Sequence, residues 1–155
     1  MAGADSAGIT VNIRAEGLKE AQRALMAVSK EASKELLTDM KRLMDPIVLE
    51  ARSNASWSSQ IPRTVKPMQR VTKTKVSVGV KAGGMGVDYA GLYEFGNKGA
   101  RRAQSKFRHP VFGNKDVWVD QPTRPFLMPA VHSHLRDVMP QLESCVNRVL
   151  RKHGL

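Results

Sequence analysis

The hydrophobic positions of this chain recur with two different spacings, which predict strands and helices in a definite order. Apolar residues alternate with polar ones over residues 9–13, the period of a half-buried strand. From residue 18 to residue 47 they recur every three or four positions, so we expect one long amphipathic helix over residues 16–52, about 55 Å long. Pro46 lacks an amide donor and should kink or interrupt its last turns.

The next stretch is predicted to be a loop followed by strands. Residues 53–67 are rich in Ser, Asn and Pro, which is typical of a loop, and Trp57 and Ile61 are expected to pin that loop to the body. Valines alternate with polar and basic residues over 71–81. This pattern predicts one or two strands with a solvated basic face.

The last part of the chain alternates short ordered segments with one loop and ends in a helix. We expect a short helical turn at residues 89–95, a basic loop at about 97–107 and a strand at 115–121. A second amphipathic helix is predicted from Pro129 to about His153. Pro140 should interrupt this helix and kink it.

The order of strand, long helix, strands, basic loop, strand and helix predicts the α+β class. We expect a small antiparallel sheet covered by the long N-terminal helix and the C-terminal helix. The length of 155 residues suits a single domain, with a flexible N-terminus at residues 1–8. The chain has no run of about 18 apolar residues, so we expect no membrane partner. One cysteine, Cys145, cannot form an internal disulfide, which indicates synthesis in a reducing cytoplasm.

The net charge of +11 is concentrated in the middle of the chain. Residues 63–115 contain twelve basic residues and two acidic ones, Asp88 and Glu94, whereas residues 1–62 are neutral overall and residues 116–155 carry a net charge of +1. A field of this kind attracts polyanions or an acidic protein surface. A solvated basic surface without a partner is the alternative interpretation.

The residue types that usually carry catalysis or bind metals show no productive spacing. His132 and His134 are two positions apart on a predicted helix, so they point to opposite sides of it, and Cys145 completes no zinc-ligand pattern. The glycines of residues 83–86 lack the Gly-Lys-Ser/Thr of a phosphate loop. No serine lies in a nucleophile elbow. We therefore predict a protein that is not an enzyme and needs no metal or cofactor.

Glu94 is an acidic residue whose role the pattern leaves open. It is either exposed or, when partly buried, accepts a hydrogen bond or pairs with an arginine such as Arg124, whose planar guanidinium suits a carboxylate. A catalytic pair with Asp88 has no support from the neighbouring residues.

The aromatic residues gather in three clusters. The first reads Tyr-Ala-Gly-Leu-Tyr-Glu-Phe-Gly at 89–96, the second Arg-His-Pro-Val-Phe-Gly at 108–113, and the third Arg-Pro-Phe-Leu-Met-Pro-Ala-Val at 124–131. All four Phe, both Tyr and Trp118 lie in or between these clusters. A chain with so few aromatic residues is therefore expected to build a specific core here.

This ordered set of clusters resembles the tailed-bacteriophage neck and tail-completion family, which includes the gene-ten-type head–tail joining proteins and relatives of minor tail protein Z. In that family a Tyr-Ala…Glu-Phe-Gly element precedes a His-Pro-Val-Phe-Gly…Trp…Gln element, and an Arg-Pro-Phe…Pro-Ala element opens the last helix. The resemblance covers residues 76–135. Carried over by position, the structural and interface residues are Tyr89, Glu94, Phe95, Gly96, His109, Pro110, Gly113, Trp118, Gln121, Arg124, Pro125, Phe126, Pro129 and Ala130.

The resemblance implies a tail-terminator-like fold and a structural role in the neck or tail of a siphophage virion, without enzymatic activity. Members of the family form rings, usually of six subunits, between the capsid connector and the tail. The implied partners are further copies of this chain, the head–tail connector or stopper, the tail-tube proteins and the genome DNA that passes through the ring. A basic set would face that DNA channel or dock on an acidic surface: Lys98, Arg101, Arg102, Lys106 and Arg108.

A basic, non-sequence-specific nucleic-acid-binding protein is the alternative interpretation of the charge. Phosphate contacts through the residues of the predicted basic loop would need no recognition of bases. Against it, the stretch from Lys98 to Lys106 has no aromatic residue on which a base could stack, and the chain has no zinc-finger or helix-turn-helix spacing.

Overall fold

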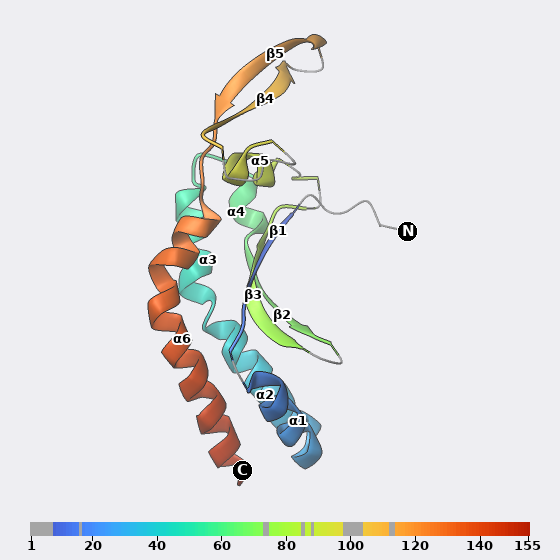
Figure 1. The fold of residues 1–155 in the computed structure, drawn as a ribbon, viewed down its shortest axis with the longest axis vertical. Helices are drawn as coiled ribbons and strands as arrows, with labels where there is room; N and C mark the ends of the chain where they lie inside the picture. The colour runs from blue at the N-terminus through green and yellow to red at the C-terminus, as the bar shows by residue number, and fades with distance from the viewer. Residues whose placement is uncertain are drawn as a thin grey trace.

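The chain forms a small antiparallel sheet packed against helices, with a two-stranded arm at one end (Figure 1). A computed structural model describes residues 8–15, 17–72, 75–84, 86–87, 89–97, 104–111 and 114–155. The helices are α1 (Leu18–Val28), α2 (Lys30–Arg42), α3 (Asp45–Asn54), α4 (Ile61–Thr64), α5 (Ala90–Phe95) and α6 (Leu127–Lys152), and the strands are β1 (Ile9–Ile13), β2 (Lys66–Val71), β3 (Val76–Ala82), β4 (Lys106–Val111) and β5 (Asn114–Pro122). The predicted α+β class is confirmed.

The single helix predicted for residues 16–52 is wrong, because this segment forms α1, α2 and α3. The first break is at Ser29, whose backbone is extended (φ −162°, ψ 153°) and whose hydroxyl accepts a hydrogen bond from the Ala32 amide at 3.0 Å. Such a cap starts a new helix. The second break precedes Pro46, which lies in the first turn of α3, where its missing amide leaves no helical bond unmade. The predicted interruption at Pro46 is therefore confirmed.

The predicted apolar stripe is nevertheless the buried side of these helices. Leu25 and Leu36 are fully buried, whereas Val28, next to the break, is 50 % exposed. The break turns α1 so that it packs beside α2, where Gln22 donates a buried hydrogen bond to the Ser33 hydroxyl at 3.2 Å. The periodicity thus identified the buried residues, although it could not show where the helix axis changes direction.

The sheet has the strand order β1-β3-β2, and both pairs are antiparallel. The strand predicted at residues 9–13 is confirmed as β1, and the valine pattern of residues 71–81 belongs to the end of β2 and to β3. Alternate residues of β3 point to opposite faces of the sheet. Val76, Val78 and Val80 are buried in the main core, so Gly79 and Lys81 point to the outer face.

Gly79 is required by a close approach between two strands. A Cβ atom at this position would lie 1.9 Å from the carbonyl oxygen of Val11 in β1. No real Cβ contact is that short, so any side chain here would push β1 away from β3. The glycine allows β1 to pack tightly against the central strand.

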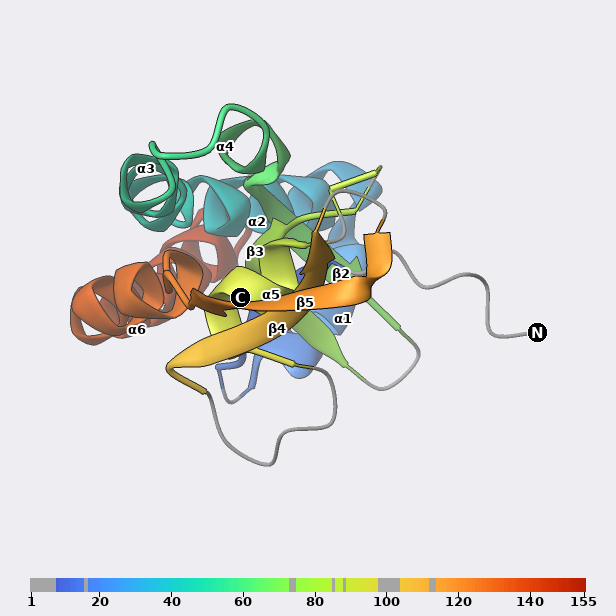
Figure 2. The same cartoon turned by 90° about the horizontal axis from the view of Figure 1, so that it is seen from above.

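Helix α6 lies beside α2 and α3 along its length (Figures 1 and 2). Its predicted stripe is confirmed, since Val138, Leu142 and Val149 are each at most 3 % exposed. The predicted interruption at Pro140 is wrong, because α6 continues through it without a break. Pro140 is exposed, so water can bond to the Arg136 carbonyl, which would otherwise bond to the missing amide.

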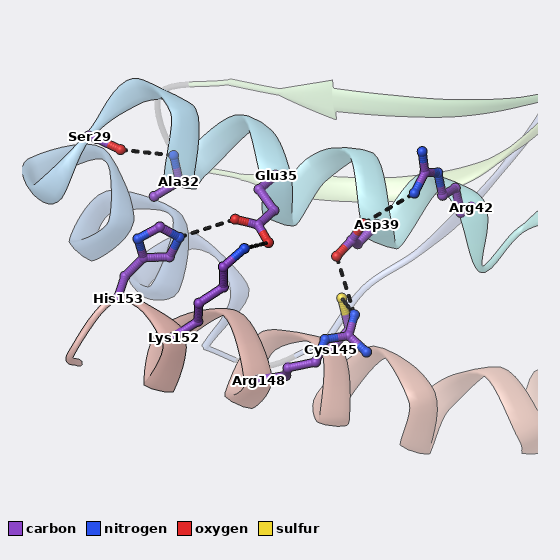
Figure 3. A network of polar contacts seen from close by, with 9 residues as sticks. All are labelled: Ser29, Ala32, Glu35, Asp39, Arg42, Cys145, Arg148, Lys152 and His153. Atoms are coloured by element: carbon purple, nitrogen blue, oxygen red, sulfur yellow. Dashed lines mark hydrogen bonds and ion pairs between the residues drawn. The ribbon is translucent and has the colours of Figure 1, made fainter.

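Ion pairs join α6 to α2 along one side of their contact (Figure 3). Glu35 accepts a hydrogen bond from Lys152 Nζ at 2.7 Å and contacts His153 Nε2 at 3.1 Å, while Asp39 pairs with Arg148 at 3.2 Å. The hydrogen bond from Lys152, followed by that from His153, holds the pKa of Glu35 below its ordinary value. Exposed ion pairs contribute little stability each, so they mainly fix how the two helices are aligned.

The segment predicted to be a loop at residues 53–67 contains α4 and the start of β2. The Ser58 hydroxyl accepts hydrogen bonds from the amides of Gln60 and Ile61 and so starts α4. Ile61 is fully buried, and Trp57 packs against the core, which confirms that both residues pin this segment.

Strands β4 and β5 form a separate antiparallel sheet, which extends from the body at the end opposite the C-terminus (Figure 1). We call this two-stranded sheet the arm. The strand predicted at residues 115–121 is confirmed as β5, and the helical turn predicted at 89–95 is confirmed as α5. Strand β4 begins at Lys106, inside the stretch predicted to be a loop, because Lys106 already pairs with Pro122 of β5. The flexible N-terminus predicted for residues 1–8 lies, except for Gly8, outside the described residues.

Candidate assembly site

The three sequence clusters meet where the arm joins the body, and a buried carboxylate connects two of them. Glu94, in α5, is 2 % exposed. Its two oxygens accept hydrogen bonds from the backbone amides of Phe126 at 2.8 Å, Leu127 at 2.9 Å and Met128 at 2.8 Å. Amides at the start of a helix have no partner within that helix, and the positive end of the helix dipole favours a negative group. Glu94 therefore caps α6 from a distant part of the chain.

Of the predictions for Glu94, the role of hydrogen-bond acceptor is confirmed and the exposed position is wrong. Arg124 is not its partner. The guanidinium of Arg124 lies over the ring of Trp57, 5.2 Å from the ring centroid, and the Arg124 amide donates to the Tyr93 carbonyl at 2.8 Å. The partners of Glu94 are main-chain amides, which leave no mark in the sequence.

A chain of side-chain hydrogen bonds connects the second cluster to the first. Gln121 Nε2 donates to the Tyr93 hydroxyl at 2.8 Å, and Gln121 Oε1 lies 2.8 Å from His109 Nε2, which can donate to it. The other ring nitrogen of His109 lies 3.0 Å from the Pro110 carbonyl oxygen. Gln121 and His109 come from the two strands of the arm, whereas Tyr93 belongs to α5. These bonds fix the direction in which the arm leaves the body.

Tyr93 is also the centre of an aromatic cluster. The centroid of its ring lies 4.5 Å from that of Trp57, 5.1 Å from that of Phe107 and 6.1 Å from that of Tyr89, and the Phe107 and Tyr89 contacts are edge-to-face. Such pairs are worth about 0.5–1.5 kcal/mol each beyond the apolar area that they bury. The cluster therefore joins the segment before α4, helix α5 and strand β4.

These side chains line a cleft of about 530 Å³ at the base of the arm. Most of its lining is aromatic or polar and uncharged: Trp57, Ser58, Ser59, Tyr89, Leu92, Tyr93, Phe107, His109 and Gln121. Both oxygens of the neighbouring Glu94 are occupied by amides. Among the described residues, no group of three His, Cys, Asp or Glu side chains could hold a metal ion.

The arm has two chemically different faces. Phe107 pairs with Gln121 and His109 pairs with Val119, so one face continues the aromatic lining of the cleft and carries Val117 further out. Trp118 lies on the opposite face, where its indole N–H donates to the Lys115 carbonyl at 2.9 Å.

Strand β5 exposes large apolar side chains on both of these faces. Val117 is 48 % exposed, Trp118 50 % and Val119 37 %. The indole N–H of Trp118 has its partner within the strand, so what this residue presents to the outside is the apolar surface of its ring.

Two of the five predicted basic residues also lie on the arm. Lys106 pairs with Asp120 at 2.9 Å, and Arg108 pairs with the same carboxylate at 3.5 Å. The hydrogen bond from Lys106 is the main cause that lowers the pKa of Asp120. Lys98, Arg101 and Arg102 lie outside the described residues, as does Gly113 of the motif.

The remaining motif residues frame the same junction. Phe126 is fully buried at the start of α6, preceded by Pro125, and Pro129 lies in the first turn, where an amide would have no helical partner. Ala130 is buried, and Phe95 is 39 % exposed.

The turn after α5 depends on a glycine and an asparagine. Gly96 has a φ of 90°, which side chains rarely adopt, and a Cβ atom there would lie 2.7 Å from the side chain of Gln104. Asn97 then joins the turn to β4, since its side chain accepts from the Arg108 amide at 3.2 Å and donates to the Arg108 carbonyl at 3.3 Å. The sequence pattern did not predict this role of Asn97, because it did not predict the strand β4 to which Arg108 belongs.

No protein-family model matches this chain, and neither a curated protein nor a solved structure does. Within the described part of the chain, no helix is both long enough and apolar enough to cross a membrane.

Proposed function

We propose that this chain is a structural component of a siphophage virion, which forms a ring at the head–tail junction and completes or terminates the tail. The order of the three motif clusters supports this role, and one observation carries it: the arm exposes Val117, Trp118 and Val119 to solvent. A two-stranded sheet is at best marginally stable alone, and its unpaired edges and apolar side chains favour contact with another chain. An arm of this kind is suited to assembly.

The arm projects from one end of an elongated molecule (Figure 1). In this proposal it contacts a different surface of the neighbouring subunit. Contacts between unlike surfaces repeat from subunit to subunit and close when the rotation permits. In this proposal the ring surrounds the path of the genome DNA, between the connector or stopper and the tail tube.

The motif residues would then act by holding the arm at a fixed angle. Glu94 secures the point where the chain returns to α6, and the Tyr93–Gln121–His109 bonds secure the base of the arm. A ring closes only when every subunit presents the same angle to the next. No step of this role requires turnover of a substrate, and we propose that the chain has no enzymatic activity and needs no cofactor.

Light scattering coupled to size exclusion, together with negative-stain images of the purified protein and of phage tails, tests this proposal. We expect rings for the natural protein and smaller species for the double variant Val117→Thr with Trp118→Ser. Leu49→Ser is the matched control, because Leu49 is a 64 % exposed apolar residue in α3, away from the arm. Monomers under all conditions, together with absence of the protein from virions, would contradict the proposal.

A further inference from the structure

The outer face of the main sheet carries a row of basic residues. Lys81 of β3 pairs with Lys66 of β2 on one side and with Thr10 of β1 on the other, so all three lie on the same face. Arg70 pairs with Ser77. Both lie on the same face, four positions along their strands from Lys66 and Lys81. Lys66, Arg70 and Lys81 are exposed. The row is thus built into the strand register.

The charges of this row are not neutralised within the described part of the chain. The ion pairs found there lie within α2, between helices or on the arm, and none involves Arg63, Lys66, Arg70 or Lys81. Like charges directly opposite each other, such as Lys66 and Lys81, destabilise a pair of strands. A ligand that brings negative charge to this face would remove that repulsion.

A cleft of about 210 Å³ lies at the end of the row, and three cationic side chains, Arg63, Lys66 and Lys81, line it together with the threonines at 10 and 64. The Thr64 hydroxyl donates to the Ile61 carbonyl at 2.7 Å and accepts from the Gly83 amide at 2.8 Å. The first bond lies within α4, and the second attaches α4 to Gly83, the residue after β3. Arg63, the neighbour of Thr64, is therefore held beside the two lysines.

We propose that Arg63, Lys66, Arg70 and Lys81, the basic row, bind the phosphodiester backbone of nucleic acid without reading its bases. Lys66 and Arg70 are four positions apart on β2, about 13 Å at 3.3 Å per residue, which is long enough to span successive phosphates. Asn12, Ser77 and Gly79 on the neighbouring strands are small or polar, so a backbone can approach there, and Met68 lies between Lys66 and Arg70.

The composition of the face favours nucleic acid over other anions. Its charges extend along a strand, as phosphates do along a polymer, and no carboxylate among the described residues is interleaved with them. The positions that share the face include no aromatic residue, so bases cannot stack there and single strands gain nothing over duplexes. This inference deepens the proposed function, since it names the face that would meet the DNA.

Fluorescence anisotropy with a labelled duplex of about 25 base pairs, over a range of salt concentrations, tests the basic row. We expect the triple variant Arg63→Ala, Lys66→Ala, Lys81→Ala to bind at least about tenfold more weakly and the slope of log affinity against log salt to fall by about 2–3. Lys66→Arg with Lys81→Arg should keep the affinity.

The matched control is the triple variant Lys30→Ala, Lys34→Ala, Lys41→Ala in α2, which removes the same charge. It should change binding less than about threefold, because Glu31, Glu35 and Asp39 interleave with those lysines.

Three results would overturn the inference. One is unchanged binding by the triple variant, and another is equally tight binding of polyglutamate by the natural protein, which would indicate an acidic protein surface. The third is loss of binding in Lys98→Ala, Arg101→Ala, Arg102→Ala instead, which would place the phosphate contacts on the predicted basic loop.

Light scattering on the same variants separates this inference from the proposed function. Loss of DNA binding with assembly intact supports the basic row. Failure to assemble with DNA binding intact contradicts only the ring.

Discussion

Glu94 shows how much of this fold depends on a side chain whose partners are all main-chain amides. Its carboxylate satisfies the first amides of α6, although the two segments are 32 positions apart. The sequence cluster at 89–96 identified Glu94 as a position of interest, but its chemistry stayed open. Main-chain donors are available at the start of every helix, so only the position of Glu94 beside the first turn of α6 selects which acid meets them.

Removal of the Glu94 carboxylate should destabilise the whole protein. Glu94→Ala leaves three amides without their acceptor, two of them in buried contacts, and we expect it to lower the free energy of unfolding by about 3 kcal/mol. Glu94→Gln keeps an acceptor oxygen but loses the charge, and should cost about 1–2 kcal/mol. Urea denaturation measures both. Glu143→Gln, at an exposed position of α6, is the control, and an equal effect of this control would contradict the assignment.

The close approach at Gly79 predicts a second large effect. Gly79→Ala would place a Cβ atom against the Val11 carbonyl, so β1 would have to separate from β3, at a cost of about 3 kcal/mol in the free energy of unfolding. Ser77→Ala, two positions earlier on the same strand face, loses only a 3.4 Å hydrogen bond to Asn12 and should cost less than about 1 kcal/mol. Equal stability of the two variants in urea would show that β1 does not pack as described.

Cys145 should react slowly with thiol reagents in the folded protein. The residue is 2 % exposed, and desolvation by burial raises its pKa, although the neighbouring Arg148 acts in the opposite direction. Little thiolate is therefore present at neutral pH. We expect labelling by a disulfide reagent at pH ~7.5 to be at least about tenfold slower than in urea-unfolded protein. Labelling of the native protein at the unfolded rate would show that α6 does not bury this thiol against the core.

At the scale of elements, hydrophobic periodicity located the buried residues better than the ends of the helices. The stripe from Leu18 to Ile47 is continuous in the sequence, yet the helix breaks at Ser29 and before Pro46. Pro46 has a recognisable effect on the backbone, so its break could be predicted. Ser29 is not marked as a break by the sequence pattern, and only the structure shows that its hydroxyl caps the next helix. Similarly, Pro140 did not break α6, because the position is exposed and water can replace the missing helical hydrogen bond.

The contact between α2 and α6 predicts a defined response to acid. Because hydrogen bonds from Lys152 and then His153 lower the pKa of Glu35, its contribution to stability is present above the ordinary carboxyl pKa, near 4, and is lost as the pH falls through the lowered value. Glu35→Gln lacks this contribution at every pH. Thermal unfolding should therefore show a stabilising effect of Glu35 at pH ~6 that disappears towards pH ~3. Parallel curves for the two proteins over this range would contradict it.

At the scale of the molecule, the α+β class and the sheet followed from the order of patterns, whereas the arm did not. Residues 97–107 have little apolar content and were predicted as a loop, yet the last two of them start β4, and residues 108–111 continue this strand by pairing with β5. Cross-strand pairing is a long-range property that a local pattern does not contain. Tyr93 and His109 lie in two of the clusters and Gln121 in the family motif, but the sequence pattern did not predict that these three side chains meet.

The arm should contribute much less than the body to the free energy of unfolding. Replacement of residues 109–119 by a short Gly-Ser turn removes most of the arm and leaves the main core intact, since none of the core residues lies in that range. We expect the free energy of unfolding to fall by less than about 2 kcal/mol, while ring formation is lost. Urea denaturation and light scattering measure the two effects. Cooperative collapse of the whole fold would show that the arm belongs to the core.

The long-range cap has a consequence for how such a protein diversifies. Because the Glu94 carboxylate accepts a hydrogen bond from the Phe126 amide, the two ends of the intervening segment are held next to each other. Such a segment can lengthen, shorten or change its surface while the helices and sheet beneath keep their boundaries. The surface of this segment can therefore change during evolution without a change in the core, because one buried carboxylate holds its two ends together.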